Sequence, residues 1–418
     1  MPQACFARWR GVLAVVVATT FTFSVSAEDW PQWRGPQRNG ISQETGLKAQ
    51  WSEGGPKLIW QAEKLGDGYG AVAVAAGKVY LTANEGLDNE LIKALDAETG
   101  EVLWGTRIGK VGNPDQRPNY PAARSTPTVD GENIYVMSSD GDIACVKAKS
   151  GEIVWQRNVR ADFGGRPGEW AYAESPLVDG EKVVVTPGGS EAAIVALNKQ
   201  DGKTIWKAQV PGSEDAAYAS LMPVTVDGVK QYVAYLGMGV VGVNAENGKF
   251  LWSYTQTKGN ANMPTPVVSG DIVYSGTTRT GGGAVQLSVE DGQVKTDELY
   301  LDSKLPNAIG GAVQVGDYLY GASGSILVCA NFKTGEVQWQ ERISAPASLI
   351  FADGRLYLHT EDGNVIMVQA SPEGFQKLGE FTPPGRPEGI GKSWAYPVIA
   401  DGRLYIRQHG TVWCYDVK

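Results

Sequence analysis

The chain has 418 residues, 42% of them hydrophobic and 20% charged, which is ordinary for a globular protein with a large core. Its 46 acidic and 37 basic residues give a net charge of −9, which argues against nucleic acid as a partner because phosphate binding needs a basic face. The high counts of Gly, 53, and of Trp, 13, indicate many tight turns and many large ring anchors.

Residues 1–27 have the pattern of an export signal. Two arginines precede an apolar run, Gly11 to Phe23, that is too short to span a bilayer. Small residues end this segment, and we expect cleavage after Ala27, although an uncleaved membrane anchor fits the same pattern. Loss of the two arginines leaves a net charge of about −11. We therefore expect an exported protein, periplasmic or extracellular, with no transmembrane segment further along the chain.

Residues 28–55 follow the signal and are rich in turn formers. We expect an ordered strap against the rest of the protein, anchored by Trp30, Trp33 and Trp51, because large rings seldom stay in water. A flexible leader is the alternative.

From residue 56 onward, a short turn between two strand-like runs recurs eight times. Asp-Gly between apolar runs predicts a β-hairpin, and a period of roughly 40 to 55 residues is typical of propeller blades. The eight turns are Ala76-Gly77, Asp130-Gly131, Asp179-Gly180, Asp227-Gly228, Gly270-Asp271, Gly316-Asp317, Asp353-Gly354 and Asp401-Gly402.

A second marker follows the hairpins: a turn that ends in Gly, with Trp four residues later. Its fullest form runs from Ala94 to Trp104, with Gly100 in the turn. The Gly supplies positive φ, and the Trp ring can fill the gap between adjacent blades. The related segments pair Gly151 with Trp155, Gly202 with Trp206, Gly248 with Trp252 and Gly335 with Trp339, whereas Gly292 and Gly374 are followed by Thr296 and Leu378.

This second marker resembles the tryptophan-docking motif, Ala-x-Asp-x-x-Thr-Gly-x-x-x-Trp, of the pyrroloquinoline quinone (PQQ) repeat superfamily. Ala94, Asp96, Thr99, Gly100 and Trp104 match every fixed position. The resemblance covers residues 56–418 and implies an all-β, eight-bladed β-propeller. The chain is also similar in repeat type to the propeller subunit of the outer-membrane β-barrel assembly machinery. This similarity implies a scaffold role.

The two chain ends predict how the ring closes. The eighth repeat stops at Tyr415 to Lys418, before its last strand, and Lys57 to Trp60 supplies a strand that ends in Trp. We expect this N-terminal strand to complete the last blade and hide a sheet edge. Seven blades with a loose C-terminal hairpin is the alternative. The same repeat register puts Cys145, Cys329 and Cys414 in three different blades, too far apart to form disulfides.

Residues just before the first strand of each repeat should converge on the mouth of the central channel. They are rich in aromatic and amide groups, which suit sugars, peptides or small polar ligands. A hydrated channel without a ligand is the alternative, and the Arg and Glu of this set could simply pair with each other. The predicted ligand-binding residues are Tyr69, Arg124, Tyr172, Glu174, Tyr218, Asn262, Asn307 and Trp394, with Asn260 and Tyr396 beside them.

These observations predict a monomeric, non-enzymatic ligand-binding or protein-interaction scaffold without cofactor or metal. No catalytic residue is assigned. The family resemblance implies one alternative from another class, a PQQ-dependent oxidoreductase that holds the quinone with calcium. The chain has no adjacent cysteines of the kind that many such dehydrogenases carry, and none of their calcium ligands maps onto a residue here.

Overall fold

The computed structural model describes residue 1 and residues 29–115, 122–213, 215–385 and 391–418. The predicted export signal, apart from Met1, lies outside the described residues. Within these ranges the one helix is α1 (Val159–Phe163). A search of the same ranges finds no helical segment with the length and apolar character needed to cross a bilayer.

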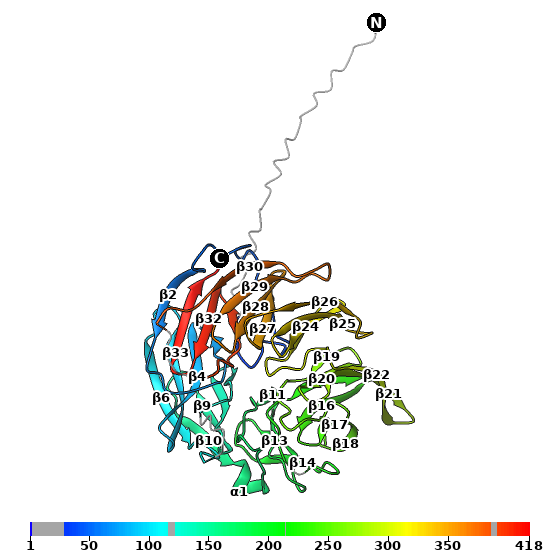
Figure 1. Cartoon of the computed structure of the whole chain (residues 1–418). Helices are drawn as coiled ribbons and strands as arrows, with labels where there is room; N and C mark the ends of the chain where they lie inside the picture. Colours follow the sequence, from blue (N-terminus) through cyan, green and yellow to red (C-terminus); the bar gives the residue numbers. More distant parts are fainter. Residues whose placement is uncertain (2–28, 116–121, 214, 386–390) are drawn as a thin grey trace.

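Eight sheets follow one another around a ring (Figure 1), seven of four antiparallel strands and one with a fifth, parallel strand, which confirms the predicted eight-bladed propeller. Blades one to four contain β3 (Ala73–Ala75), β4 (Lys78–Glu85), β5 (Asn89–Asp96) and β6 (Val102–Gly109); β7 (Thr128–Asp130), β8 (Asn133–Met137), β9 (Asp142–Lys147) and β10 (Ile153–Asn158); β11 (Leu177–Asp179), β12 (Lys182–Val185), β13 (Ile194–Asn198) and β14 (Thr204–Ala208); and β15 (Met222–Val226), β16 (Val229–Leu236), β17 (Gly239–Asn244) and β18 (Phe250–Tyr254).

Blades five to eight have the same order of strands, with two additions from the N-terminal part of the chain. Two-residue β1 extends blade seven, and β2 completes blade eight. These blades contain β19 (Val267–Ser269), β20 (Ile272–Thr277), β21 (Gly281–Glu290) and β22 (Gln293–Asp302); β23 (Ala312–Val315), β24 (Tyr318–Ser323), β25 (Ile326–Asn331) and β26 (Val337–Arg342); β27 (Ala347–Ala352), β28 (Arg355–Thr360), β29 (Val365–Gln369), β30 (Lys377–Phe381) and β1 (Ile41–Ser42); and β31 (Val398–Ala400), β32 (Arg403–Gln408), β33 (Thr411–Asp416) and β2 (Lys57–Ala62).

The docking rings lie across the Gly turns of neighbouring blades. A Cβ placed on Gly100 would come 2.6 Å from the Trp60 ring, and one on Gly202 would come 2.8 Å from the Trp155 ring, so a side chain does not fit there. The indole N–H of Trp155 donates to the carbonyl of Lys199 at 2.9 Å. Each of these rings therefore joins two sheets by packing and by one hydrogen bond.

Blade five uses a tyrosine in this role. The repeat pattern placed Thr296 where other blades have Trp, but the β21–β22 hairpin is longer than in the other blades, with ten residues in each strand. Tyr300, four residues further along, packs against Gly335 and donates its hydroxyl to the carbonyl of Phe332 at 2.6 Å. Tyr300 lies opposite Ala284, the ladder position that the docking Trp takes in other blades, so only its sequence distance from the turn differs.

Blade seven takes its ring from the strap. Leu378 stands at the repeat position of the docking Trp, and Trp51 covers the adjacent Gly379, where an added Cβ would come 2.8 Å from Trp51. The Trp51 ring also lies 5.3 Å from the ring of Phe381. A residue more than 300 positions away in sequence thus replaces the missing docking ring.

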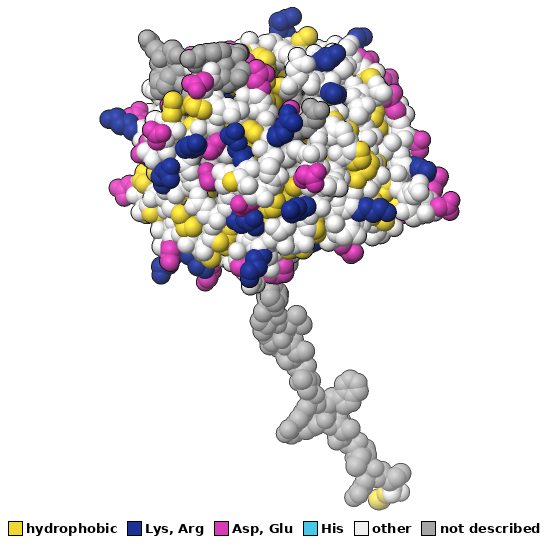
Figure 2. All heavy atoms as spheres, turned by 90° about the horizontal axis from the view of Figure 1, so that it is seen from below, with side chains coloured by type: hydrophobic (Ala, Val, Ile, Leu, Met, Phe, Trp, Pro, Cys, Tyr) yellow, Lys and Arg dark blue, Asp and Glu magenta, His cyan; other side chains and the backbone are white. Residues whose placement is uncertain are grey.

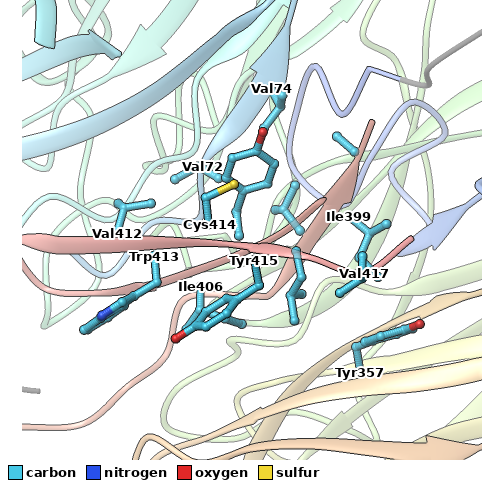
Figure 3. Close-up of a cluster of buried hydrophobic side chains, with 14 of the residues drawn as sticks. Val72, Val74, Tyr357, Ile399, Ile406, Val412, Trp413, Cys414, Tyr415 and Val417 are labelled. Carbon is cyan, nitrogen blue, oxygen red and sulfur yellow. The ribbon is translucent and has the colours of Figure 1, made fainter. Parts of the chain in front are cut away.

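The ring closes between the two ends of the chain, as the sequence predicts. β2 pairs with β33 in antiparallel register, with Trp60 opposite Cys414, and in Figure 1 the blue β2 lies beside the red β33. Trp413 and Tyr415 project to one side of β33 and Cys414 to the other (Figure 3). The indole of Trp60 donates to the carbonyl of Ala97 in blade one at 2.9 Å, so the closing strand also docks onto the first blade.

The strap crosses the propeller axis and contacts all eight blades. Trp30 exchanges two backbone hydrogen bonds of 2.8 Å with Val74 in blade one, and β1 pairs in parallel with β27 in blade seven. The other hydrogen bonds join Pro31 to Val129 in blade two, Arg38 to Ser175 and Pro176 in blade three and to Leu221 in blade four, Trp33 to Thr265 in blade five, Arg34 to Ala312 in blade six, and Lys48 to Val417 in blade eight.

Arg38 is as deeply buried as Arg34 in the strap, with 2% of its surface exposed. It donates to the carbonyls of Ser175, Pro176 and Leu221 and to Oε1 of Gln32, at 3.0 to 3.2 Å. Burial lowers its pKa to about 9, against the opposing effect of the Glu174 charge. The guanidinium therefore stays charged at neutral pH, and the carbonyls replace its lost hydration.

The three cysteines among the described residues, Cys145, Cys329 and Cys414, are free and buried, which confirms that they form no disulfide with one another. Burial raises the pKa of the Cys145 and Cys329 thiols to about 11 and that of Cys414 to about 12, so all three stay protonated and unreactive at neutral pH. Each lies opposite a tyrosine of the neighbouring strand, namely Tyr135, Tyr320 and Tyr405.

The outer surface carries charges of both signs. On the face in Figure 2, acidic and basic side chains are interspersed, with hydrophobic side chains scattered between them. Nucleic-acid binding needs a continuous basic stripe or patch, and this face does not present one.

A buried carboxylate joins blades one and two. Glu90 accepts hydrogen bonds from the backbone N and the Oγ of Ser139, at 3.0 and 2.6 Å. Burial raises its pKa to about 7, although the Ser139 bonds and the Arg124 charge act in the opposite direction. The protonated acid is therefore the form that the fold favours.

Trp60→Ala tests the closure of the ring. Loss of a buried aromatic side chain should lower the free energy of unfolding by about 3–5 kcal/mol in urea titrations. Ile59→Ala is the control, because this neighbour on β2 is 39% exposed and should cost less than about 1 kcal/mol. Equal, small effects of both substitutions would mean that Trp60 does not close the ring.

Glu90 also predicts a pH dependence of stability. The pKa of Glu90 in the folded protein is about 7, above the ordinary value of 4.5. Its contribution to the free energy of unfolding is therefore fully present below about pH 4.5 and is lost as the pH rises to about 7. The loss between pH 4.5 and 8 should reach about 3 kcal/mol, since one pKa unit corresponds to about 1.4 kcal/mol.

Urea titrations of the Glu90→Gln variant at pH 5 and pH 8 should therefore show a smaller difference in stability than the wild-type protein does. Glu132→Gln, at an exposed position, is the control and should leave the wild-type difference intact. An unchanged pH dependence in Glu90→Gln would show that the Glu90 carboxylate is solvated in the folded state.

Candidate functional site

The loops that lead into the innermost strands enclose a cavity of about 360 Å³, which we call the mouth cup. All eight blades and the strap contribute to its wall. The lining residues are Trp33, Tyr69, Arg124, Trp170, Ala173, Tyr218, Ala261, Met263, Thr278, Ala308, Ile309, Gly324, Pro346, Glu361, Trp394 and Tyr396.

Three of the residues predicted from the sequence form one side of the cup. The ring of Tyr69 lies 4.7 Å from that of Trp394, and the guanidinium of Arg124 lies 5.3 Å from the centre of the Tyr69 ring. Burial lowers the pKa of Arg124, while the nearby Glu90 carboxyl favours its charge. This side therefore combines two flat apolar faces with one cation.

The opposite side and the base of the cup are also aromatic. Tyr218, another predicted residue, lies 5.9 Å from the ring of Trp170, whose backbone N donates to the Tyr218 hydroxyl. Trp33 of the strap lies 4.6 Å from the ring of Tyr396 in an edge-to-face arrangement, and its indole donates to Oγ1 of Thr265. Because the strap fills the axis here, the channel ends in a cup.

Glu361 lines the cup and was missed by the sequence reasoning. Its two carboxylate oxygens accept from Nζ of Lys392 at 2.6 Å and from Nε1 of Trp394 at 2.8 Å. The residues predicted from the sequence all precede the first strand of a blade. Glu361 instead lies in the turn between the second and third strands of blade seven. Its carboxylate is neutralised by Lys392 and orients Trp394.

Four predicted residues point away from the cup, because successive side chains of an extended segment alternate in direction. Ala173 faces the cup, and its neighbours Tyr172 and Glu174 are buried inside the blades. Asn262 likewise lies between the lining residues Ala261 and Met263. Asn307 precedes the lining residue Ala308 and donates to Oγ of Ser323 at 3.0 Å.

Glu174 lies close to the strap. It accepts a hydrogen bond from the backbone N of Thr186, and the charge of Arg38 stabilises its ionised form. Burial nevertheless raises its pKa to about 7. Its surroundings are thus those of a structural link between blade three and the strap, and a ligand role for Glu174 stays a prediction.

A calcium-bound quinone does not fit the donors of the mouth cup. Ca²⁺ takes six to eight oxygen ligands, and the one carboxylate among the described lining residues, Glu361, is already bonded to Lys392 and Trp394. Across the described ranges of the chain, no group of three His, Cys, Asp or Glu residues is placed to hold a metal ion.

Comparisons with known proteins find relatives of two kinds, assembly factors and quinoprotein dehydrogenases. It is 24% identical over 359 residues to the outer membrane protein assembly factor BamB of Yersinia pestis, which spans 78% of this chain and 79% of that protein. It is 26% identical over 250 residues to the quinoprotein alcohol dehydrogenase PedH of Pseudomonas putida, 58% of this chain and 38% of the dehydrogenase.

The fold of the chain also matches solved structures. The crystal structure of BamB from Moraxella catarrhalis superposes with a TM-score of 0.60 at 14% identity, covering 86% of this chain and 97% of that one. A family model described as outer membrane protein assembly factor BamB matches residues 41–169, 88–274 and 259–372. The chain therefore belongs to the PQQ-like repeat propeller family that this model describes.

Proposed function

We propose that this chain is an exported, monomeric and non-enzymatic binding propeller that receives its partner at the mouth cup. The observation that carries this proposal is the convergence of six aromatic rings and one guanidinium, from the blades and the strap, on a single cavity. Trp, Tyr and Arg are the side chains that dominate binding energy at interfaces. The relatives named as assembly factors support a scaffold role.

The proposed organisation of the chain follows from this role. Residues 1–27 direct export to the periplasm or the extracellular space, residues 28–55 form the strap, and residues 56–418 form the propeller. The cup requires no cofactor in this proposal, because aromatic and apolar surface supplies the binding energy.

The dye 8-anilinonaphthalene-1-sulfonate tests whether the cup accepts an apolar ligand. One dye molecule should bind per chain with enhanced fluorescence, because the rings exclude water and Arg124 attracts the sulfonate. Ala173→Trp should abolish this binding by filling the cup. Lys304→Trp, at an exposed position outside the cup, should leave it unchanged. Failure of the dye to bind, or equal binding to both variants, would contradict a ligand site in the cup.

A PQQ-dependent oxidoreductase is the second candidate, because a quinoprotein alcohol dehydrogenase is among the relatives. Titration of the purified chain with PQQ and Ca²⁺ should leave the quinone absorbance unchanged, and the mixture should not reduce an artificial electron acceptor when ethanol is added. A stoichiometric absorbance change together with alcohol-dependent reduction would establish the enzyme and overturn the non-enzymatic proposal.

A further inference from the structure

A second hollow opens beside the mouth cup. It has a volume of about 510 Å³, and its described lining residues lie at 168–169, 212, 215–218, 237–238, 258, 260 and 262. We call it the blade-four groove. Tyr218 lines both hollows, and Asn260 lines the groove where its neighbour Ala261 lines the cup. The two hollows therefore share a ridge, and one occupant that crosses this ridge can fill both.

The cup is apolar, and the charges on its wall already have partners. Arg124 and Glu361 are the charged side chains among its described lining residues. The guanidinium of Arg124 lies over the Tyr69 ring, 5.3 Å from its centre, and the Glu361 carboxylate accepts from Nζ of Lys392 at 2.6 Å. A charged group on an occupant would lose its hydration among rings and aliphatic side chains. The cup therefore favours an apolar body without charge.

The groove carries charges of both signs. The carboxylate of Asp215 pairs with Arg166, whose Nε lies 3.1 Å from Oδ1, and the exposed Glu169 and Lys258 lie on two other loops. An anion or a cation in the groove would therefore meet a like charge as well as an opposite one, and like charges repel. A neutral polar group avoids this repulsion.

The side chains of the groove offer both kinds of hydrogen-bonding group. The carboxylates of Glu169 and Asp215 accept hydrogen bonds, the ammonium group of Lys258 donates them, and the amide of Asn260 does both. A hydroxyl group also donates and accepts. A head with several hydroxyl groups therefore matches the mixture of donors and acceptors without adding a charge.

The main chain at the groove is already hydrogen-bonded. The carbonyl of Gly168 accepts from the backbone N of Ala171 at 3.0 Å, and the backbone N of Gly237 donates to the carbonyl of Asp215 at 3.2 Å. An extended peptide that paired with these groups would have to displace the existing bonds. Recognition in the groove therefore falls to the side chains, which favours a polyhydroxyl head over a peptide backbone.

The groove is formed in the absence of an occupant. Asn262 is 2% exposed; its amide donates to the carbonyl of Leu236 at 2.7 Å, and its Oδ1 accepts from the backbone N of Gly259 at 2.9 Å. The backbone N of Tyr218 donates to the carbonyl of Asn262 at 3.1 Å. These bonds hold three loops together, so binding would require little ordering of the protein.

We propose that the mouth cup and the blade-four groove together bind a monomeric, uncharged amphiphile, with its apolar chain or ring in the cup and a polyhydroxyl head, such as a sugar, in the groove. This inference rests on the proposed binding function of the cup and adds the chemical class of the ligand.

Displacement of the naphthalene sulfonate dye from the cup tests the inference, with each competitor kept below its critical micelle concentration. The competitor n-octyl β-D-maltoside carries both parts of the ligand, whereas 1-octanol lacks the head and maltose lacks the chain. Octyl sulfate and octyltrimethylammonium carry a charge in place of the sugar. The maltoside should displace the dye at a concentration at least tenfold lower than each of the other four, because it alone fills both hollows with matching groups.

Substitutions in the groove test where the head lies. Asn260→Trp fills the groove from an exposed position and should raise the concentration of maltoside needed for displacement to that of octanol. Asn260→Ala, the milder change, removes one amide and should raise this concentration at least threefold. Lys304→Trp lies outside both hollows and should leave every competitor as in the wild type. Equal thermal midpoints establish that the variants are folded.

The outcomes distinguish the inference from the proposed function. If the dye binds but the maltoside displaces it no better than octanol, or if maltose or a charged amphiphile displaces it more strongly, the inference fails and the cup remains a ligand site. A wild-type response of both Asn260 variants would place the head outside the groove and overturn the inference as well. If neither the dye nor, by calorimetry, the maltoside binds, the proposed function of the cup fails.

Discussion

The strap across the axis is the constraint on which the rest of this propeller depends. Side chains of the innermost strands point along and around the axis, and in this chain the space between them is filled by residues that precede the ring in sequence. Arg34 and Arg38 are each 2% exposed, so their guanidinium groups have lost nearly all hydration. Carbonyl groups of blades three, four and six accept their hydrogen bonds, which makes a buried cation tolerable.

Filling the axis also determines what the channel can do. Because Trp33 contacts Thr265 and Tyr396 at the base of the cup, the hollow at the mouth does not continue as an open pore through the strap. A ligand would therefore reach the described part of the cup from the face that carries the loops before the innermost strands. The same segment that links the blades thus sets the depth and the aromatic character of the candidate site.

Much of the fold could be predicted because its determinants repeat. Hairpin turns recur in each blade and docking Trp residues in most blades, and the matching halves of blade eight at the two chain ends indicate the closure. The replacements could not be predicted, because Tyr300 lies four residues beyond the repeat position and Trp51 comes from the strap. The spacing of residues within a repeat does not indicate which distant ring fills a gap in the packing. The packing requires only that some aromatic ring covers Gly335 and Gly379.

The candidate site was harder to predict than the fold for a related reason. Convergence of the loops follows from the topology, and it brings together Tyr69, Arg124, Tyr218 and Trp394. The direction of each side chain depends on the phase of a short extended segment, where a shift of one residue turns a lining group into a buried one. Ala173 thus lines the cup while Glu174 is buried beside the strap, and Glu361 comes from a turn that the repeat does not mark.

The described lining residues of the cup have the chemistry of a binding surface. Proton transfer needs a group that is free to change its charge within reach of the ligand. The cup carboxylate, Glu361, is engaged by Lys392 and Trp394, and the carboxyls of raised pKa, Glu90 and Glu174, are buried behind the wall, where Ser139 and Thr186 hold them. Among the described lining residues, six aromatic rings and the Arg124 guanidinium face the hollow, and such groups recognise shape and charge. Propellers of one family can therefore support different functions, because the loops at the mouth can change while the docking rings and turns that build the blades stay the same.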